Sequence, residues 1–452
     1  MAKELALWAE QAGIKPPKLA AATFQGLRGM AALEEIQPQE SFVTMPVSAT
    51  LFVTPRMRCP FPDFVSADLW SQASPYVKLA LLLLHAKQQG PASPFAAYIN
   101  QLPRSFDTPV FWPEEAVRQL QYPHLEAEVA EQRRAWQAAS DELESATPGS
   151  SISRDELFWA LSCVRSRCFS GPYTGSSLKS KAKVAVVLLV LSAALTRFHV
   201  PIEQIVNGGV AAALFNLIYD VLLSRQLKWF ALLPLIDSMN HKSTAQGEVA
   251  REYFTDAIVA VSGKHYKKGE QVFISYGEQG NDRLLQFYGF VERGNPHDAF
   301  VLRGLDQRLA ADCGVPAAQL ASRMAALNEA GLADTLQQAV LTRAGPDPKL
   351  LQALRLLLAS QGPSAASAGG ALEGQGETRV YEALRSALEG ERLRHSSSLQ
   401  QDEAALAKSS RLLGERDRLA LQFRVEKKRL LADCVGQADK RLKGLRSKAG
   451  GP

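Results

Sequence analysis

The sequence predicts an α+β fold in which strands from two distant parts of the chain combine with long helical stretches. Three short runs near the start, at residues 27–33, 41–47 and 50–53, have the composition and turn signals of strands. Strand signals return only at residues 252–261 and 271–275. Most of the sequence between and after these runs repeats its apolar residues at helical spacing. The β part is therefore expected to assemble from segments far apart in the sequence.

The N-terminal part is predicted to begin with a helix and to continue as a small antiparallel sheet. Residues 3–14 have helical spacing, with one apolar side formed by Leu5, Trp8, Ala9 and Ala12. After Pro16 and Pro17 the first strand-like runs follow one another, separated by two turn signals. We expect these neighbouring runs to pair with one another.

A large helical insert is predicted from Pro75 to Arg225. Its most apolar part, Val184–Leu195, is a twelve-residue run between flanking lysines and Arg197. A helix of that length cannot cross the ~30 Å hydrocarbon core of a membrane, so we expect a buried helix. The helices predicted in the insert lie at residues 77–89, 95–101, 114–121, 126–144, 154–167, 181–198 and 211–223.

Beyond Asn295 the chain is predicted to be helical again. Residues 360–376, rich in Gly, Ser and Ala, interrupt this part and are expected to form a surface loop. The helices predicted here lie at residues 316–330, 333–342, 349–359, 378–388, 400–408 and 415–443.

Composition excludes several classes of protein. The 452 residues are 46% hydrophobic and 21% charged, which is not the composition of a disordered, collagen-like or disulfide-stapled chain. At roughly 100 to 200 residues per domain, the length suggests two or three domains. The cysteines are scattered without a CxxC pair, so we expect free thiols in a reducing compartment and no zinc site. They are Cys59, Cys163, Cys168, Cys313 and Cys434.

The net positive charge arises at the C-terminal end. The chain has 51 Lys and Arg against 46 Asp and Glu, a formal net charge of +5. Residues 424–448 hold nine basic and three acidic residues, a local +6, so the rest of the chain is near −1. Apolar residues interleave this run at helical spacing, and we expect a solvated end of an amphipathic helix. The alternative that the protein is associated with nucleic acid is supported by this basic run alone.

Residues 232–241 are the segment densest in candidate functional side chains. An apolar run there ends in Asp237, Asn240 and His241. Such polar groups are costly to bury unless they have partners. A capped turn that leaves a core strand explains them equally well, and the segment alone does not decide between the two.

Two tyrosines further along the chain each precede a glycine. Tyr276 follows the predicted strand 271–275 and precedes Gly277, and Tyr288 precedes Gly289. A glycine lets another backbone or a ligand approach closely. On spacing alone, however, such tyrosines are more often core aromatics.

Together these segments resemble the SET-domain methyltransferases. The shared order is Asn240-His241 after an apolar stretch, a Gly-Glu strand that ends in Tyr276, and Leu-Leu-x-x-Tyr-Gly-Phe ending at Phe290. The similarity is to the subgroup that contains the Rubisco large-subunit lysine methyltransferase, whose SET domain carries a long helical insert. The similarity extends over nearly the whole chain. The further segments that carry it are residues 26–30 with Pro46, 93–98 with Leu102, Pro103 and Trp112, 158–169, 351–359, 381–388 and 398–406.

The resemblance implies a SET β-fold, in which a pseudoknot threads the later chain past Asn240-His241, and an all-α C-terminal substrate-binding domain. The implied division is residues 1–60 for the N-terminal helix and first SET part, 61–228 for the helical insert, 229–293 for the second SET part and 294–445 for the substrate-binding domain.

The resemblance also implies roles for individual residues. S-adenosyl-L-methionine is the implied cofactor, and no metal is implied. Tyr276 is expected to carry the essential catalytic hydroxyl. The lysine channel is expected to be walled by Phe169, Tyr253 and Tyr288. The residues expected to line the cofactor site are Leu27, Arg28, Arg167, Asp237, Asn240, His241, Tyr276 and Phe290.

The implied function is that of a protein-lysine N-methyltransferase acting on a non-histone protein. Relatives of the same fold methylate a histidine in actin, but they carry Asn where this chain has Phe169 and lack a tyrosine at the place of Tyr288, so lysine is favoured. A catalytically silent SET protein that acts as a binding module is a further alternative.

The expected partner is a protein substrate that presents a lysine, with no nucleic acid and no membrane, and we expect a monomer. Because the N-terminus shows no secretory or transit signal, the expected location is cytoplasmic, or the plastid stroma if a transit peptide is missing from this sequence.

Overall fold

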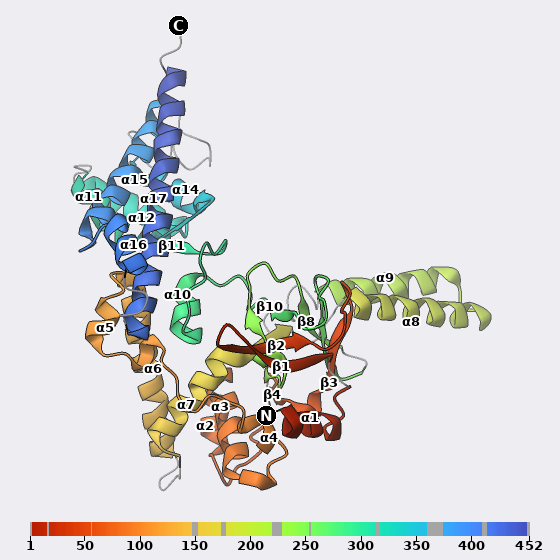
Figure 1. Cartoon of the computed structure of the whole chain (residues 1–452). Helices are drawn as coiled ribbons and strands as arrows, with labels where there is room; N and C mark the ends of the chain where they lie inside the picture. The colour runs from red at the N-terminus through yellow and green to blue at the C-terminus, as the bar shows by residue number, and fades with distance from the viewer. Residues whose placement is uncertain are drawn as a thin grey trace. The chain divides into compact units, whose positions relative to one another are not determined.

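The chain divides into two compact units, which are described separately below. The computed structural model describes residues 2–15, 18–55, 57–146, 152–172, 178–218, 228–252, 255–312, 317–358, 374–408 and 414–449. The first unit comprises Met1–Phe106 and Ala135–Gly277, and the second comprises Asp107–Arg134 and Glu278–Pro452. The mixed α+β class predicted from the sequence is confirmed (Figure 1).

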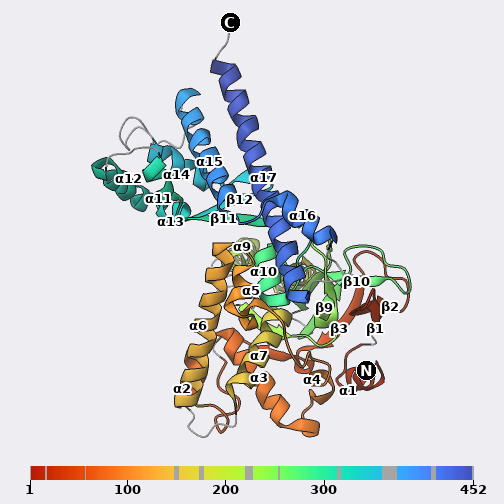
Figure 2. The same ribbon diagram turned by 60° about the vertical axis from the view of Figure 1, so that its left-hand side comes forward.

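Three small sheets form the β part of the first unit. Their strand orders are β1-β2-β10-β7, β3-β9-β8 and β4-β6-β5. Each sheet joins an early strand to a late one, as predicted, and both views of the chain show β2 beside β10 (Figure 1, Figure 2). The strands are β1 (Leu19–Phe24), β2 (Leu27–Ala32), β3 (Ser41–Pro46), β4 (Leu51–Val53), β5 (Cys168–Pro172), β6 (Lys228–Leu232), β7 (Asn240–His241), β8 (Glu248–Glu252), β9 (Ala257–Val261) and β10 (Gln271–Ile274).

The expectation that the first strand-like runs pair with one another is wrong. β2, β3 and β4 lie in three different sheets, and each finds its partner late in the chain. Turn signals between runs show that the chain reverses, but they do not show which strand it then meets. The predicted strand at 252–261 is also two strands, β8 and β9, which pair antiparallel.

Helices of the insert cover this β part. α7 begins with a capping box, in which the Ser153 side chain accepts from the Glu156 backbone and the Glu156 side chain accepts from the Ser153 backbone. The core of the unit draws on both halves of the split β part, including Met45, Ile258 and Val272. The helices are α1 (Ala2–Gln11), α2 (Ala67–Gln72), α3 (Pro75–Gln88), α4 (Ala96–Ile99), α7 (Arg154–Arg167), α8 (Leu178–Arg197), α9 (Ile202–Ile218) and the later part of α6 (Pro123–Ala146).

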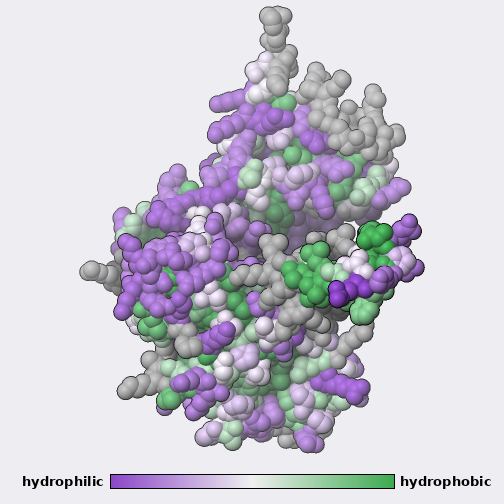
Figure 3. Space-filling view, turned by 90° about the vertical axis from the view of Figure 1, so that its right-hand side faces the viewer, coloured by the Kyte–Doolittle hydropathy of each residue, from purple (hydrophilic) through white to green (hydrophobic). Residues whose placement is uncertain are grey.

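The apolar helix predicted to be buried is exposed. Val184–Leu195 is helical, within α8, but Leu189 is 70% exposed and Val190 is 65% exposed. Figure 3 shows hydrophobic side chains on the surface over α8 and α9. The prediction assumed that other parts of the same chain bury this helix. Among the described elements, α8 makes substantial contact only with α9.

The second unit is mostly helical around one small sheet, of order β11-β12-β13. The helix predicted at 333–342 is wrong in its second half, because Gln338–Thr342 pairs antiparallel with Ala299–Arg303. Cross-strand pairing of the β-branched Val340 with Val301 overrides the helical spacing. The elements are α5 (Glu114–Arg118), α10 (Asn281–Arg283), η6 (Leu284–Tyr288), β11 (Ala299–Arg303), α11 (Leu305–Asp312), α12 (Ala317–Glu329), α13 (Ala333–Gln337), β12 (Gln338–Thr342), β13 (Gly345–Pro346), α14 (Pro348–Leu358), α15 (Gly374–Arg394), α16 (Leu399–Lys408) and α17 (Glu415–Ala449).

The basic run of α17 is not a solvated helix end over its first half, contrary to the prediction. Lys427 is buried, and its Nζ donates to Asp282 Oδ2 and Asp298 Oδ1, both at 2.7 Å, and to the Ala299 carbonyl at 2.6 Å. Burial opposes the charge on Lys427, but the attraction of the two carboxylates outweighs it and raises the pKa of the ammonium. Lys428 likewise pairs with the buried Asp402. These residues anchor α17 within the second unit.

No helix in the described part of the chain is both long enough and apolar enough to cross a membrane. Cys59, Cys163, Cys168 and Cys434 are free thiols, as predicted, and Cys313 lies outside the described residues.

Replacing Lys427 by Met is expected to destabilise the second unit. The substitution leaves Asp282 and Asp298 buried without their cation, which costs about 3–5 kcal/mol. The measurement is the free energy of unfolding from urea titration. Lys443→Met is the matched control, since Lys443 is an exposed lysine of the same helix, and it should change the unfolding free energy by less than about 0.5 kcal/mol. Equal effects of the two substitutions would contradict the anchoring role.

Acid is expected to destabilise the second unit through His124. Burial and the nearby Arg303 and Lys427 lower the pKa of His124 to about 4, and its Nδ1 accepts a hydrogen bond from Arg303 at 3.2 Å. Because this pKa lies below the ordinary value near 6.5, the neutral ring contributes stability above pH ~6.5 that is lost as the pH falls through about 4.

An asparagine at position 124 keeps an acceptor for Arg303 but does not titrate. The unfolding free energy of His124→Asn should therefore fall less than that of the wild type as the pH falls from 6.5 to 4. The expected difference is on the order of 1–2 kcal/mol for this half-buried group, allowing for solvent screening. Urea titrations at several pH values measure it, with the exposed His199→Asn as control. Parallel pH profiles for wild type and His124→Asn would refute the assignment.

Candidate functional site

The pairing of β7 with β10 brings two predicted site segments together. The strands run parallel, with Asn240 opposite Phe273 and His241 opposite Ile274. The backbone N–H of Tyr276 donates to His241 Nδ1 at 3.0 Å, and the two rings lie 5.0 Å apart between centroids. Nδ1 must be unprotonated to accept this bond, so the ring is held in one tautomer.

The hydroxyl of Tyr276 has a fixed direction. It donates to the carbonyl of Met239 at 2.8 Å, two residues before His241. The ring packs, half-buried, against the core of the first unit. Tyr276 is therefore held at both its backbone and its hydroxyl by the segment that carries Asn240 and His241.

The start of strand β2 reaches the same place. Asn240 Nδ2 donates to the carbonyl of Arg28 at 2.9 Å. A Cβ atom on Gly29 would lie 2.6 Å from Gln271 Nε2 and 3.0 Å from Asn240 Nδ2, so only glycine fits without a shift. Sequence reasoning did not single out Gln271, and nothing in its local sequence marks it.

Asp237 lies at the centre of a buried polar cluster. Its Oδ2 accepts from the Tyr98 hydroxyl at 2.6 Å, and its Oδ1 accepts from Ser238 Oγ at 3.2 Å. Arg167 Nη1 donates to the Asp237 carbonyl at 3.0 Å and lies 3.7 Å from Oδ2. Burial raises the pKa of the Asp237 carboxyl, although Arg167 and these hydrogen bonds oppose the shift.

Tyr98 is a member of this cluster that sequence reasoning did not assign to the site. It lies on α4 and is completely buried, and burial raises the pKa of its hydroxyl well above the ordinary value. Tyr98 lies in residues 93–98, which carried part of the family resemblance. That resemblance was the signal in the sequence that could have assigned Tyr98 to the site. It acts through Asp237, so we regard it as a positioning residue.

Two arginines beside Asp237 make the cluster suited to an anion. Burial by itself lowers the pKa of Arg167, but the attraction of Asp237 outweighs it and raises that pKa. Burial, and then the charge of Arg167, lower the pKa of Arg28. Arg167 Nε is buried with no hydrogen-bond partner among the described residues. A buried guanidinium N–H without a partner fits the carboxylate of an amino-acid-like ligand.

The predicted site residues are brought together only in part. Phe169 lies on β5 opposite Ala231 and packs against the same core as Tyr276. Leu27 is 69% exposed at the start of β2. Tyr253 lies outside the described residues. Tyr288 and Phe290 lie in the second unit, where their ring centroids are 6.3 Å apart.

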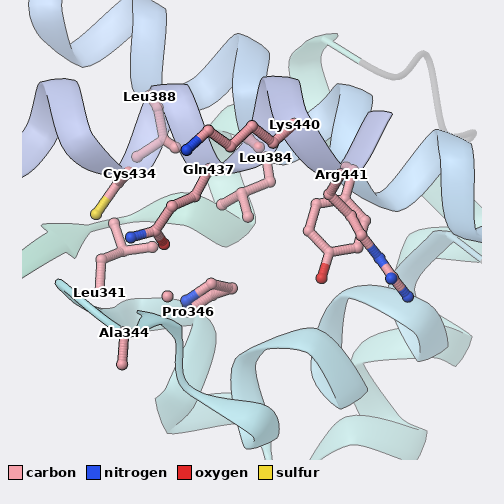
Figure 4. A pocket seen from close by; sticks show the side chains of 12 residues that line it. Leu341, Ala344, Pro346, Leu384, Leu388, Cys434, Gln437, Lys440 and Arg441 are labelled. Atoms are coloured by element: carbon pink, nitrogen blue, oxygen red, sulfur yellow. The ribbon is translucent and has the colours of Figure 1, made fainter. Parts of the chain in front are cut away.

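Further features of the described chain concern metal binding and the second unit. No group of three or more His, Cys, Asp or Glu within the described ranges could hold a metal ion. The second unit has a pocket of about 430 Å³ between β12, β13, α15 and α17, with Lys440 and Arg441 at its edge (Figure 4). Its floor is apolar and includes Leu341, Leu384 and Leu388.

Comparison with known proteins relates the chain to one family. The family Rubisco LSMT substrate-binding matches residues 317–431. The ribosomal lysine N-methyltransferase set10 of Schizosaccharomyces pombe is 26% identical over 54% of this chain and 35% of its own length. The actin-histidine N-methyltransferase of Danio rerio is 26% identical over 60% of this chain and 38% of its own length. The chain thus spans a little over a third of these two relatives.

A solved structure agrees over a longer stretch. The SET domain of LSMT bound to lysine and AdoHcy superimposes with a TM-score of 0.66 over 98% of this chain and 93% of that one, at 18% identity. This similarity shows a shared fold. Together with the matched substrate-binding region, it makes the chain similar to SET-domain methyltransferases such as Rubisco LSMT.

Proposed function

We propose that the chain is an S-adenosyl-L-methionine-dependent protein-lysine N-methyltransferase that acts on a non-histone protein. The observation that carries this proposal is the β7–β10 pairing, which holds Asn240, His241 and Tyr276 at one place. The similarity to set10, named a ribosomal lysine N-methyltransferase, and to an LSMT structure with lysine and AdoHcy supports the same activity.

The residues of the first unit fit the proposed cofactor. Arg167, with its unpartnered Nε, and the nearby Arg28 would hold the carboxylate, and the close backbone at Gly29 would let the ligand approach β2. When bound, S-adenosyl-L-methionine supplies a methyl group on a cationic sulfur. Asp237 would keep Arg167 in place rather than contact the cofactor itself, since three side chains already surround its carboxylate.

The protein's work in this reaction is alignment of a lysine amine and removal of its proton. A lysine has an ordinary pKa of about 10.4, and burial beside positive charge disfavours the ammonium form. Tyr276 is the proposed catalytic residue, because its hydroxyl direction is fixed by Met239 and its backbone by His241. A preset hydroxyl orients the reacting groups without reorganisation during the reaction.

Lysine is proposed over histidine on the aromatic character of the expected channel. Phe169 offers an apolar ring, which suits the aliphatic stem of lysine, and Tyr288 is proposed as the opposite wall. An imidazole substrate would instead need a hydrogen-bonding side chain at the place of Phe169. The relation to an actin-histidine methyltransferase keeps histidine as the second candidate.

The second unit is proposed to recognise the protein substrate. Residues 317–431 match a family described as substrate-binding, and the predicted domain 294–445 contains them. The pocket at α15 and α17 combines an apolar floor with two cationic side chains, which suits an apolar residue flanked by acidic ones.

Calorimetry with S-adenosyl-L-methionine tests the proposed cofactor site. Arg167→Ala is expected to weaken binding at least about tenfold, since a charge-assisted hydrogen bond contributes about 1.5–3 kcal/mol. Asn240→Ala removes the bond to the Arg28 carbonyl and is expected to weaken binding as well. Arg154→Ala removes an exposed arginine from the same helix α7 and should bind as wild type does. Thermal unfolding checks that each variant is folded. A wild-type protein that does not bind the cofactor would refute the proposal.

Tyr276→Phe is expected to separate catalysis from cofactor binding. The substitution removes the hydroxyl but keeps the ring and the backbone bond to His241, so cofactor affinity should change by less than about threefold while kcat falls by about a hundredfold or more. The assay is transfer of labelled methyl groups to proteins of a cell lysate, with modified residues located by mass spectrometry. Tyr76→Phe is the control. Label on histidine would favour the second candidate function.

A further inference from the structure

The helices α8 and α9 form a hairpin whose sequence is uncharged over two matched lengths. Residues 184–196 of α8 contain no charged residue, and neither do residues 204–218 of α9. At 1.5 Å per residue, each stretch is about 20 Å long. Charged residues stand at both ends of the hairpin, with Lys183 at the start and Arg197 and Glu203 near the turn.

Few of the described side chains of the two helices are buried or half-buried, and those few are here called the seam. On α9 the seam contains the buried Ile205 and the half-buried Gly209, at helical spacing. On α8 it contains the half-buried Leu188, Ser192 and Leu195. The rest of the described surface of the hairpin is left for another surface to cover.

Outside the seam the described side chains of the hairpin are mostly apolar and exposed. Figure 3 shows the resulting hydrophobic surface. Twelve large apolar side chains are each more than half exposed, which is roughly 1,000 Å² of apolar surface per chain. They are Val186, Val187, Leu189, Val190, Leu191, Phe198, Ile202, Val206, Val210, Leu214, Phe215 and Ile218.

The polar groups of α8 do not offset this surface. Ser192 donates to the Leu188 carbonyl at 2.8 Å, and Thr196 donates to the carbonyls of Ser192 and Ala193. These hydroxyls are satisfied within the helix, so covering them has little cost. On α9, a Cβ on the exposed Gly208 would meet nothing within 4 Å, so another helix could approach there closely.

The charge pattern favours protein over lipid as the cover. A ~20 Å uncharged length is shorter than the ~30 Å hydrocarbon core, and the charges at both ends need water. A helix that lies on a lipid surface needs a charged face opposite its apolar face, and residues 184–196 and 204–218 contain no charged residue to form one. The α8–α9 hairpin of a second copy of this chain has the same uncharged length and the same charged ends, so it matches this surface.

We propose that two copies of this chain associate through their α8–α9 hairpins, which pack into a four-helix bundle. A symmetric dimer places the same apolar surface on both sides of the interface. A stable interface buries about 800 Å² per partner, which is of the same order as the exposed apolar surface of the hairpin.

Sedimentation equilibrium of the full chain between 1 and 50 µM tests the dimer. The wild type is expected to reach twice the mass of one chain. Leu189→Glu and Leu214→Glu place a charge in the proposed interface and should raise the dissociation constant at least tenfold. Leu393→Glu is the matched control, because Leu393 is 78% exposed but lies outside the hairpin, and it should leave the dissociation constant unchanged.

Three outcomes would overturn the proposal. One is a wild type that stays monomeric throughout this range, and another is the same dissociation constant for the hairpin variants and Leu393→Glu. The third is co-sedimentation of the wild type, but not of Leu189→Glu, with phosphatidylcholine–phosphatidylglycerol vesicles, which would assign the surface to lipid. Thermal unfolding of each variant shows that a loss of association does not come from misfolding.

Discussion

The first unit depends on a buried carboxylate, Asp237, that joins three parts of the chain. Tyr98 reaches it from α4, Arg167 reaches it from α7, and Asp237 itself ends the apolar run that leads into β7. An isolated buried carboxylate is very unfavourable, so the helical insert must supply these partners where the strand ends. The insert is thereby fixed to the β part at the residue that precedes Asn240-His241 by only a few positions.

This anchoring explains how a split β-fold can hold a precise site. The order of the strands places β10 between β2, which precedes the insert in the sequence, and β7, which follows it. Asn240 then bonds to the Arg28 carbonyl and His241 to the Tyr276 backbone, so early and late segments fix one another. Arg167 contributes to both the anchoring and the site. Its guanidinium completes the buried ion pair with Asp237, and its Nε–H has no hydrogen-bond partner among the described residues.

The sequence predicted the fold class, the split β part and most of the residues at this junction, because motifs record local chemistry. It could not predict pairings that depend on topology. Tyr98 and Asp237 are 139 residues apart, and only the folded insert brings them together. Gln338–Thr342 was expected to be helical because its spacing allows a helix, but its partner strand lies at Ala299–Arg303. Tyr253, Tyr288 and Phe290 stay predictions as channel and cofactor residues.

The basic run of α17 and the apolar run of α8 show the same limit of prediction from composition. One run is partly buried within its own unit, whereas the other is left exposed. Composition shows that each run needs a partner but not where the partner lies. Lys427 finds Asp282 and Asp298 within its own unit, whereas α8 finds only the narrow seam with α9. So little burial contributes little against the entropy of ordering the hairpin. Ordering and association should then be coupled, so that the partner stabilises the hairpin it binds.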